Sequence, residues 1–321
     1  MANVTPVPPI AHGDLESTVG FSYVFAAKDI DIAMADALDV MGLGLVRLVG
    51  GFEGSGSDTM RVEYIDGVGF DRAMAAISGE TDAITPSAPT LGYTEVALAQ
   101  YGLAFSDTYK QQLLSRQPAA LVDYLVGTIP MSWTATLRSL VCTAGSTFAT
   151  GVGAVADPLS IDVCLDLAAA RRNTSGAKIP IVGLHGTQIN QAIESARQEP
   201  AYQSSAAQFL ANSAMQDGLI YPNFLGLGFT VAHTNDVVNS GGGYVGFASA
   251  PGGIGWAGAD PSRIKAAGLN PIYVPKYGLL IENITDGAGQ SIRQVNARTF
   301  LGVAIGDPLV FFQRKVTSIN T

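Results

Sequence analysis

Residues 93–141 constrain the fold more than any other part of the chain, and they read YTEVALAQYGLAFSDTYKQQLLSRQPAALVDYLVGTIPMSWTATLRSLV. The first part, residues 93–105, predicts a long extended strand. Ser106, Asp107 and Thr108 then offer side-chain oxygens that can cap a helix, so we predict that the chain turns helical here. From Leu121 to Val141 apolar residues recur every four positions, which predicts a long helix. A long strand that leads into a long helix, without a recognisable catalytic motif, favours a structural protein over an enzyme.

Two prolines refine the helical prediction. Pro118 suits the first turn of a helix, because the backbone N–H that proline lacks has no partner there. Pro130 falls inside the apolar pattern, where proline removes a hydrogen bond and crowds the preceding turn. We therefore predict a kink or a break just before Pro130.

The composition favours an oligomer and argues against a nucleic-acid reader. The 321 residues are 47% hydrophobic and only 14% charged, and such a chain usually buries surface against partners. The net charge is −9 and the 18 basic residues are scattered, whereas phosphate binding needs clustered Lys and Arg. We expect any contact with DNA to be containment without sequence-specific binding.

Cysteine usage and hydropathy bear on the compartment. The two cysteines, Cys142 and Cys164, have no Cys-x-x-Cys spacing, and we expect reduced, buried thiols in a cytosolic compartment. No secretory signal is expected, because no basic residue precedes Lys28 and no apolar segment follows the start. Residues 237–259 carry no charge, but eight of them are glycine and Pro251 interrupts the stretch. We predict buried loops and strands there rather than a membrane span.

The first hundred residues predict an arm and a long excursion. Residues 1–27 contain Pro6, Pro8 and Pro9 and predict an extended arm, and residues 29–41 predict an amphipathic helix. Residues 45–49 and 59–65 predict two strands. Together with the strand that begins at Tyr93, residues 50–105 predict a two-stranded excursion, which needs a partner surface to be ordered.

The remainder alternates helices and strands, which predicts a compact α/β region. Helices are expected at 160–172 and 187–198, the second capped by Thr187. Strands are expected at 179–184, 225–232, 244–248, 273–284, 291–302 and 309–316, with a hairpin turn at Asp286-Gly287.

No catalytic, cofactor-binding or metal-binding residue is predicted. His12, His185 and His233 lack metal-ligand spacing, and His185, just after a strand, is expected to be structural. No phosphate-binding loop or nucleophile elbow occurs. Two other groups of residues have structural interpretations: an acidic cluster with Arg61 that forms a solvated or intersubunit face (Glu53, Asp58, Glu63 and Asp66), and two packing anchors (Trp133 and Trp256).

The order of these elements resembles the major capsid protein of tailed bacteriophages. The residues that carry the resemblance are DLAAA at 166–170, IPIVGLHGTQ at 179–188, GLGFTV at 226–231, GGYVGF at 242–247 and GWA at 255–257. The second of these blocks contains the family's "leucine-histidine-x-x-glutamine" step, with Gly186 where the family usually has proline. The resemblance covers most of the chain, and the first 50 residues match only in character.

The resemblance implies an α+β fold with a defined division of the chain. Its expected parts are an N-terminal arm and short helix (1–49), an extended loop over a neighbouring subunit (50–105), a peripheral domain with a spine helix (106–186), an axial domain (187–305) and a C-terminal strand that returns to the peripheral domain (306–321). Some relatives crosslink through a lysine on the extended loop, but this chain has no Lys between Lys28 and Lys110.

The implied function is a non-enzymatic shell subunit. Hexamers and pentamers of the chain would form an icosahedral capsid around double-stranded DNA, with a portal and, where present, scaffold or decoration proteins as partners. The capsid would assemble in the host bacterial cytoplasm and form part of the virion. Two alternatives stay open: an encapsulin-type nanocompartment shell around protein cargo, and a metabolic α/β enzyme.

Overall fold

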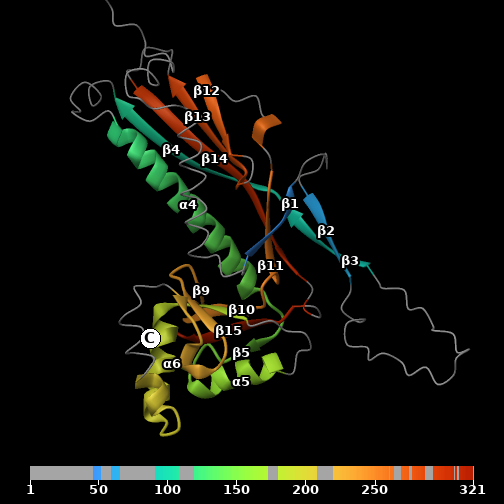
Figure 1. The fold of residues 1–321 in the computed structure, drawn as a ribbon, viewed down its shortest axis with the longest axis vertical. Helices are drawn as coiled ribbons and strands as arrows, with labels where there is room; N and C mark the ends of the chain where they lie inside the picture. The colour runs from blue at the N-terminus through green and yellow to red at the C-terminus, as the bar shows by residue number, and fades with distance from the viewer. Residues whose placement is uncertain are drawn as a thin grey trace, which may run out of the picture.

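In the computed structural model, the structure describes residues 46–51, 59–65, 91–108, 119–172, 180–207, 220–259, 261–263, 269–274, 277–285, 292–306, 308 and 311–320. They form two β-sheets, a long helix that runs along one sheet and reaches the other at its end, and a separate two-stranded hairpin (Figure 1). The α+β prediction is confirmed. The predicted N-terminal arm, the helix at 29–41 and the tip of the excursion at 66–90 lie outside the described residues.

The first sheet, here the long sheet, has six strands. They are β1 (Val46–Gly51), β4 (Ala99–Thr108), β11 (Ile254–Gly258), β12 (Leu269–Val274), β13 (Leu279–Thr285) and β14 (Ile292–Ile305). The central strand β14 pairs antiparallel with β13 and then β11 on one side and with β4 on the other. Ser106, Asp107 and Thr108 therefore belong to β4, where they pair with 292–294, and the prediction that they cap a helix is wrong. In the sheet, the backbone N–H and C=O groups of these residues hydrogen-bond to β14, which a helix cap would not provide.

Helix α4 (Ala119–Ser146) packs along the long sheet (Figure 1). Its buried face carries the predicted four-residue repeat at Ile129, Trp133, Leu137 and Val141. The helix continues through Pro130, so the predicted break is wrong. Proline removes a single hydrogen bond to the turn before it, and the packing of the neighbouring apolar side chains outweighs that loss.

The second sheet, here the seven-stranded sheet, forms the other body with helices α5 (Ile161–Arg172) and α6 (Gly186–Gln198). Its strands are β5 (Gly151–Val152), β6 (Ile181–Leu184), β7 (Ile220–Tyr221), β8 (Thr230–His233), β9 (Val238–Ser240), β10 (Gly243–Ser249) and β15 (Gln313–Ile319). Strand β6 is buried at every position and pairs parallel with β8. A second core cluster lies between this sheet and the two helices.

Several predicted boundaries need correction. Residues 225–232 contain a 3-10 turn, η2 (Phe224–Gly226), before β8 begins at Thr230. Asn223 and Leu225 have positive φ, which a strand does not allow. The predicted strand at 273–284 is two strands, β12 and β13, separated around Gly278, which has a φ of +62°. The last strand is Gln313–Ile319 rather than 309–316. Among the described residues, a second 3-10 helix, η3 (Pro261–Arg263), precedes β12.

The hairpin of β2 (Thr59–Ile65) and β3 (Leu91–Ala97) forms a two-stranded antiparallel sheet of its own. The predicted strand at 93–105 is extended throughout, but it changes partner at Leu98, with β3 in the hairpin and β4 in the long sheet. In Figure 1 the hairpin projects to one side of the long sheet.

Neither sheet is built from one consecutive range of the chain. Strands β11 to β14 fall inside 187–305 but lie in the long sheet beside α4. Strand β15 pairs along its whole length with β10 of the seven-stranded sheet. The chain thus crosses between the bodies more than once, which a division into consecutive ranges cannot represent.

Candidate functional site

The exposed face of the β2–β3 hairpin carries a compact polar and aromatic group. Arg61 Nε donates to Glu95 Oε1 at 3.1 Å across the strand pair. The guanidinium of the same arginine lies 4.5 Å from the ring centre of Tyr93. Tyr93 is 53% exposed, one of the few large apolar side chains in the described residues with such exposure. Arg and Tyr are enriched at protein interfaces, so this face has the composition of a contact surface.

Among the described residues, the contact that anchors the hairpin to the long sheet lies near the root of the hairpin. Val96, on the opposite face, is fully buried against Ala257 and Ala304. Gly302 lies beneath it, since a Cβ there would come within 2.5 Å of Val96 Cγ1 and of the Ala97 carbonyl oxygen. The close approach of β14 to β3 therefore requires glycine at this position. A hairpin fixed at one end can extend its remaining length over another molecule.

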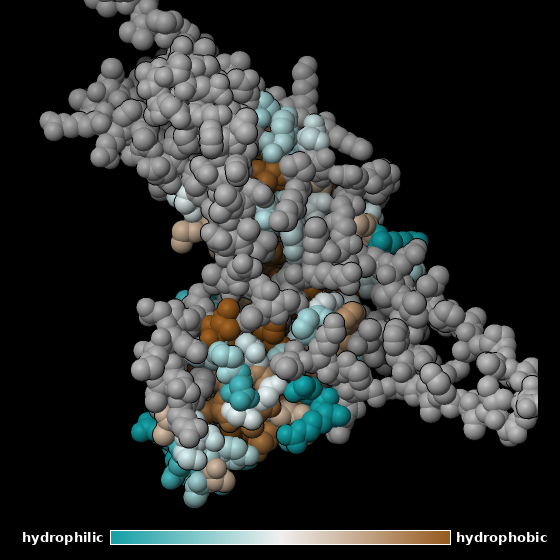
Figure 2. Space-filling model, in the orientation of Figure 1, coloured by the Kyte–Doolittle hydropathy of each residue, from teal (hydrophilic) through white to brown (hydrophobic). Residues whose placement is uncertain are grey.

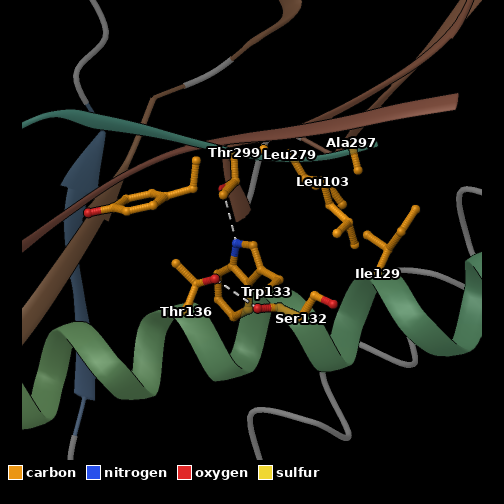
Figure 3. Close-up of a pocket in the computed structure, with 10 residues that line it drawn as sticks. Leu103, Ile129, Ser132, Trp133, Thr136, Leu279, Ala297 and Thr299 are labelled. Atoms are coloured by element: carbon orange, nitrogen blue, oxygen red, sulfur yellow. Dashed lines mark hydrogen bonds between the residues drawn. The ribbon is translucent and has the colours of Figure 1, made fainter. Parts of the chain in front are cut away.

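The centre of the α4 body is an aromatic cluster that fixes the helix on the long sheet. The rings of Trp133 and Trp256 meet edge to face at 5.4 Å, and Trp133 meets Tyr277 at 5.3 Å. Trp133 Nε1 donates to the Tyr277 carbonyl oxygen and to Thr299 Oγ1, both at 3.1 Å. Figure 3 shows the second of these bonds. The prediction that both tryptophans are packing anchors is confirmed.

A cavity of about 120 Å³ lies beside this cluster, between α4 and the long sheet. Figure 3 shows Leu103, Leu279 and Ala297 on the sheet side and Ile129 and Thr136 on the helix side. Thr136 Oγ1 donates to the Ser132 carbonyl oxygen within the helix, so it is not directed at a ligand. The lining offers apolar surface without convergent charged groups, which suits packing rather than catalysis.

His185 has the structural role that the sequence predicted. It is the N-cap of α6, and its Nδ1 accepts from the Thr187 backbone N–H at 3.2 Å. Gln188 Oε1 accepts in return from the His185 backbone N–H at 3.1 Å, which completes a capping box. The predicted capping by Thr187 is therefore wrong by two positions. The imidazole can replace a short polar side chain because it also stacks on Tyr244 at 4.0 Å.

The remaining polar end of Gln188 holds the helix to the sheet. Its Nε2 donates to the Val316 carbonyl oxygen at 3.3 Å. The leucine-histidine-x-x-glutamine step thus has a physical reason here: the histidine caps the helix, and the glutamine closes the cap and fastens it to β15. Burial, and then the nearby charge of His233, lower the pKa of His185.

The described residues offer no obvious chemistry. Within them, no three His, Cys, Asp or Glu side chains lie close enough to hold a metal ion. Cys142 and Cys164 are buried and unpaired, as expected, and burial raises the pKa of each thiol to about 12. His12 and three members of the acidic cluster, Glu53, Asp58 and Asp66, lie outside the described residues. No helix in the described part of the chain is long and apolar enough to cross a membrane.

The fold matches solved phage structures over most of the chain. Similar structures include Mycobacterium phage Che8 (10% identity, 86% of this chain and 89% of that chain, TM-score 0.52). They also include the head of Helicobacter pylori bacteriophage KHP40 (11% identity, 84% and 90%, TM-score 0.52) and the capsid of Ralstonia phage GP4 (10% identity, 86% and 86%, TM-score 0.51). No protein-family model and no curated protein sequence matches the chain. At these identities the likeness shows the fold, so the chain has a phage-capsid fold, as the resemblance predicted.

Sequence reasoning missed the contact face of the hairpin. It placed Arg61 in a broad acidic cluster, whereas its described partners are Glu95 and Tyr93, both about thirty residues later in the chain. The register of β2 against β3 aligns Arg61 with Glu95, and alternation puts Tyr93 on the same face. Counting this alternation in both strands would have found the group.

Proposed function

We propose that this chain is a major capsid subunit of a tailed phage, which assembles as hexamers and pentamers into an icosahedral shell around double-stranded DNA. The observation that carries the proposal is the fold likeness over more than four-fifths of the chain to capsids of several phages. The absence of convergent chemistry in the described residues is compatible with a purely structural, non-enzymatic role.

Each part of the fold has a role in this proposal. Helix α4 is the spine helix, and the long sheet on which it packs completes the peripheral domain. The β2–β3 hairpin is the described part of the extended loop, and its Tyr93 face contacts a neighbouring subunit. The seven-stranded sheet with α5 and α6 is the axial domain, which lies around the symmetry axes.

The charge of the chain suits a container rather than a DNA reader. With a net charge of −9, the subunit has no excess of cations to neutralise phosphates, and strong wall binding would impede genome packaging and release. DNA is enclosed without sequence-specific binding, and a portal, with scaffold or decoration proteins where present, completes the particle. Assembly takes place in the host cytoplasm and the product is the virion capsid.

Electron microscopy and sedimentation of the purified protein test the proposal. Uniform closed particles or capsomers are expected, because many weak contacts add up in a closed symmetric shell. A stable monodisperse monomer under all conditions would contradict it. The similar structures named above come from phages, so the encapsulin alternative has no comparable support.

A further inference from the structure

Helix α4 has two halves with different partners. As far as Leu137, the helix packs against the long sheet through Ile129, Trp133 and Leu137. Its second half contacts strands of the seven-stranded sheet, namely β9, β10 and β15. In Figure 1 the helix runs along the long sheet and ends at the upper edge of the other body. One continuous helix therefore spans both bodies.

The other connections between the bodies are short and contain glycine. Residues 250–253 join β10 to β11, and residues 306–312 join β14 to β15. Gly252 has a φ of +89°. Gln313 Nε2 donates to the carbonyl oxygens of Gly253 at 2.9 Å and Gly306 at 3.0 Å, so the two crossings are held to one another. In addition to these bonds, a separate set of contacts holds α4 to the seven-stranded body.

Two polar contacts attach the second half of α4 to the segment between β8 and β9. Arg138 Nε pairs with Asp236 Oδ2, and both side chains are about two-thirds or more buried. One turn later, the Cys142 thiol hydrogen-bonds with Thr234. The Thr234 backbone N–H in turn donates to the Leu184 carbonyl oxygen at 2.9 Å. This segment is thus fixed to β6 on one side and to α4 on the other.

A packing contact completes the attachment. The Phe247 ring of β10 lies between two glycines, Gly145 of α4 and Gly183 of β6. A Cβ at Gly145 would lie 2.5 Å from Phe247 Cγ, and a Cβ at Gly183 would lie 2.5 Å from Phe247 Cε1. The ring cannot move away from one glycine without meeting the other. Figure 2 shows hydrophobic residues gathered where α4 meets the seven-stranded body.

We propose that these three contacts, Arg138–Asp236, Cys142–Thr234 and Phe247 between Gly145 and Gly183, act as an interbody clamp that sets the angle of the axial domain to the spine helix. Through that angle the interbody clamp sets the curvature, and so the diameter, of the shell. This second step rests on the proposed capsid function. A small change of angle in each subunit adds up around every ring, so particle size is a sensitive measure of it.

The test compares Gly145→Ala with Gly127→Ala in the same helix. At Gly127 a Cβ meets nothing within 4 Å, so that variant gains helix propensity without touching the interbody clamp. Spin labels at Gln100→Cys on β4 and Asn190→Cys on α6 report the distance between the bodies. Both positions are exposed, and the two native thiols are buried and protonated, so they stay unlabelled.

We expect Gly145→Ala to shift or broaden the interlabel distance and to move most particles out of the wild-type diameter class. Gly127→Ala is expected to leave both measurements unchanged. A second pair of variants guards against misfolding: Arg138→Asp should broaden the distance, and Arg138→Asp with Asp236→Arg should restore it. If both Gly145→Ala and Arg138→Asp keep the wild-type distance, the interbody clamp is refuted.

The interbody clamp and its effect on shell curvature are tested by separate measurements. The distance measurement needs only the soluble subunit, so it tests the interbody clamp even if no shell forms. If a variant changes the interlabel distance while its particles keep the wild-type diameter, the link between the angle and the curvature is refuted. That result would leave the interbody clamp standing. Absence of any wild-type particle or capsomer would refute the capsid function and leave the interbody clamp standing on the distance result.

Discussion

At the scale of single residues, His185 gives the chain a pH-sensitive helix cap. Its Nδ1 must be unprotonated to accept from the Thr187 N–H, and its pKa is lowered from 6.5 by burial and by the charge of His233. The folded state therefore binds fewer protons than the unfolded state just below pH 6.5. The stabilisation is fully present above that value and is lost as the pH falls through the lowered, folded pKa.

We expect His185→Asn to flatten this pH dependence. Asparagine is a good N-cap that does not titrate, so the variant keeps the cap. His185→Ala should lose roughly 0.5–2 kcal/mol at neutral pH, as other cap deletions do. Urea unfolding followed by circular dichroism at several pH values measures both effects. If the free energy of unfolding falls equally steeply with decreasing pH in the wild type and in His185→Asn, this imidazole does not cause the pH dependence.

Gly302 decides whether the hairpin root can approach the long sheet. We expect Gly302→Ala to destabilise the fold by about 1–3 kcal/mol, the range typical of overpacking, because its Cβ would clash with backbone at Ala97. Gly102→Ala is the matched control, since the nearest atom to its Cβ would be 3.6 Å away. Denaturation midpoints of the two variants give the comparison. A smaller loss of stability in Gly302→Ala than in Gly102→Ala would argue against close packing of β14 on β3 at the hairpin root.

At the scale of elements, Pro130 shows that side-chain packing can outweigh the local preference against proline inside a helix. We expect Pro130→Ala to stabilise the protein by about 1 kcal/mol. Relief of the proline penalty of about 3 kcal/mol is partly offset by loss of about two buried methylenes, each worth about 0.8 kcal/mol. Thermal unfolding measures the change. A loss of stability would mean that the proline ring, which is buried, contributes more by packing than the backbone loses.

The elements that the sequence predicted well are those whose pattern lies within one segment. The repeat from Ile129 to Val141 identified the buried face of α4, and strand β6 and helices α5 and α6 were found within one or two residues. The errors arose where distant pairing decided the outcome. Ser106 to Thr108 have the composition of a cap, but β14, almost two hundred residues later, holds them in a sheet. Propensity in one window contains no information about such a partner.

At the scale of the whole molecule, the order of elements was enough to predict the fold class, but the assignment of strands to bodies was not. Strands β10 and β11 are separated by only a few residues, and they lie in different sheets. The glycines at 252 and 253 mark this crossing in the sequence, yet glycine also occurs in many ordinary turns of this chain. Similarly, Arg138 and Asp236 are 98 residues apart, and neither has a local pattern that predicts their pairing.

The exposed face of the hairpin leads to the last prediction, which concerns assembly. Tyr93→Ala should leave the folding of the subunit almost unchanged, because the side chain is 53% exposed and its described ring contact is to Arg61. In the proposed shell, however, the tyrosine is buried against a neighbour, and tyrosine is enriched among the interface residues whose truncation costs about 2 kcal/mol or more. Repeated at every subunit, that loss should raise the protein concentration needed for particles to form.

Light scattering against protein concentration measures that threshold, and Val155→Ala provides the control. Val155 is also exposed, but it lies in the seven-stranded body, where its contact is with Gly243 rather than with the hairpin. A raised threshold for Tyr93→Ala with normal thermal unfolding is the expected result. An unchanged threshold would mean that the hairpin face is free in the particle, and that the contacts which hold neighbouring subunits together lie elsewhere on the molecule.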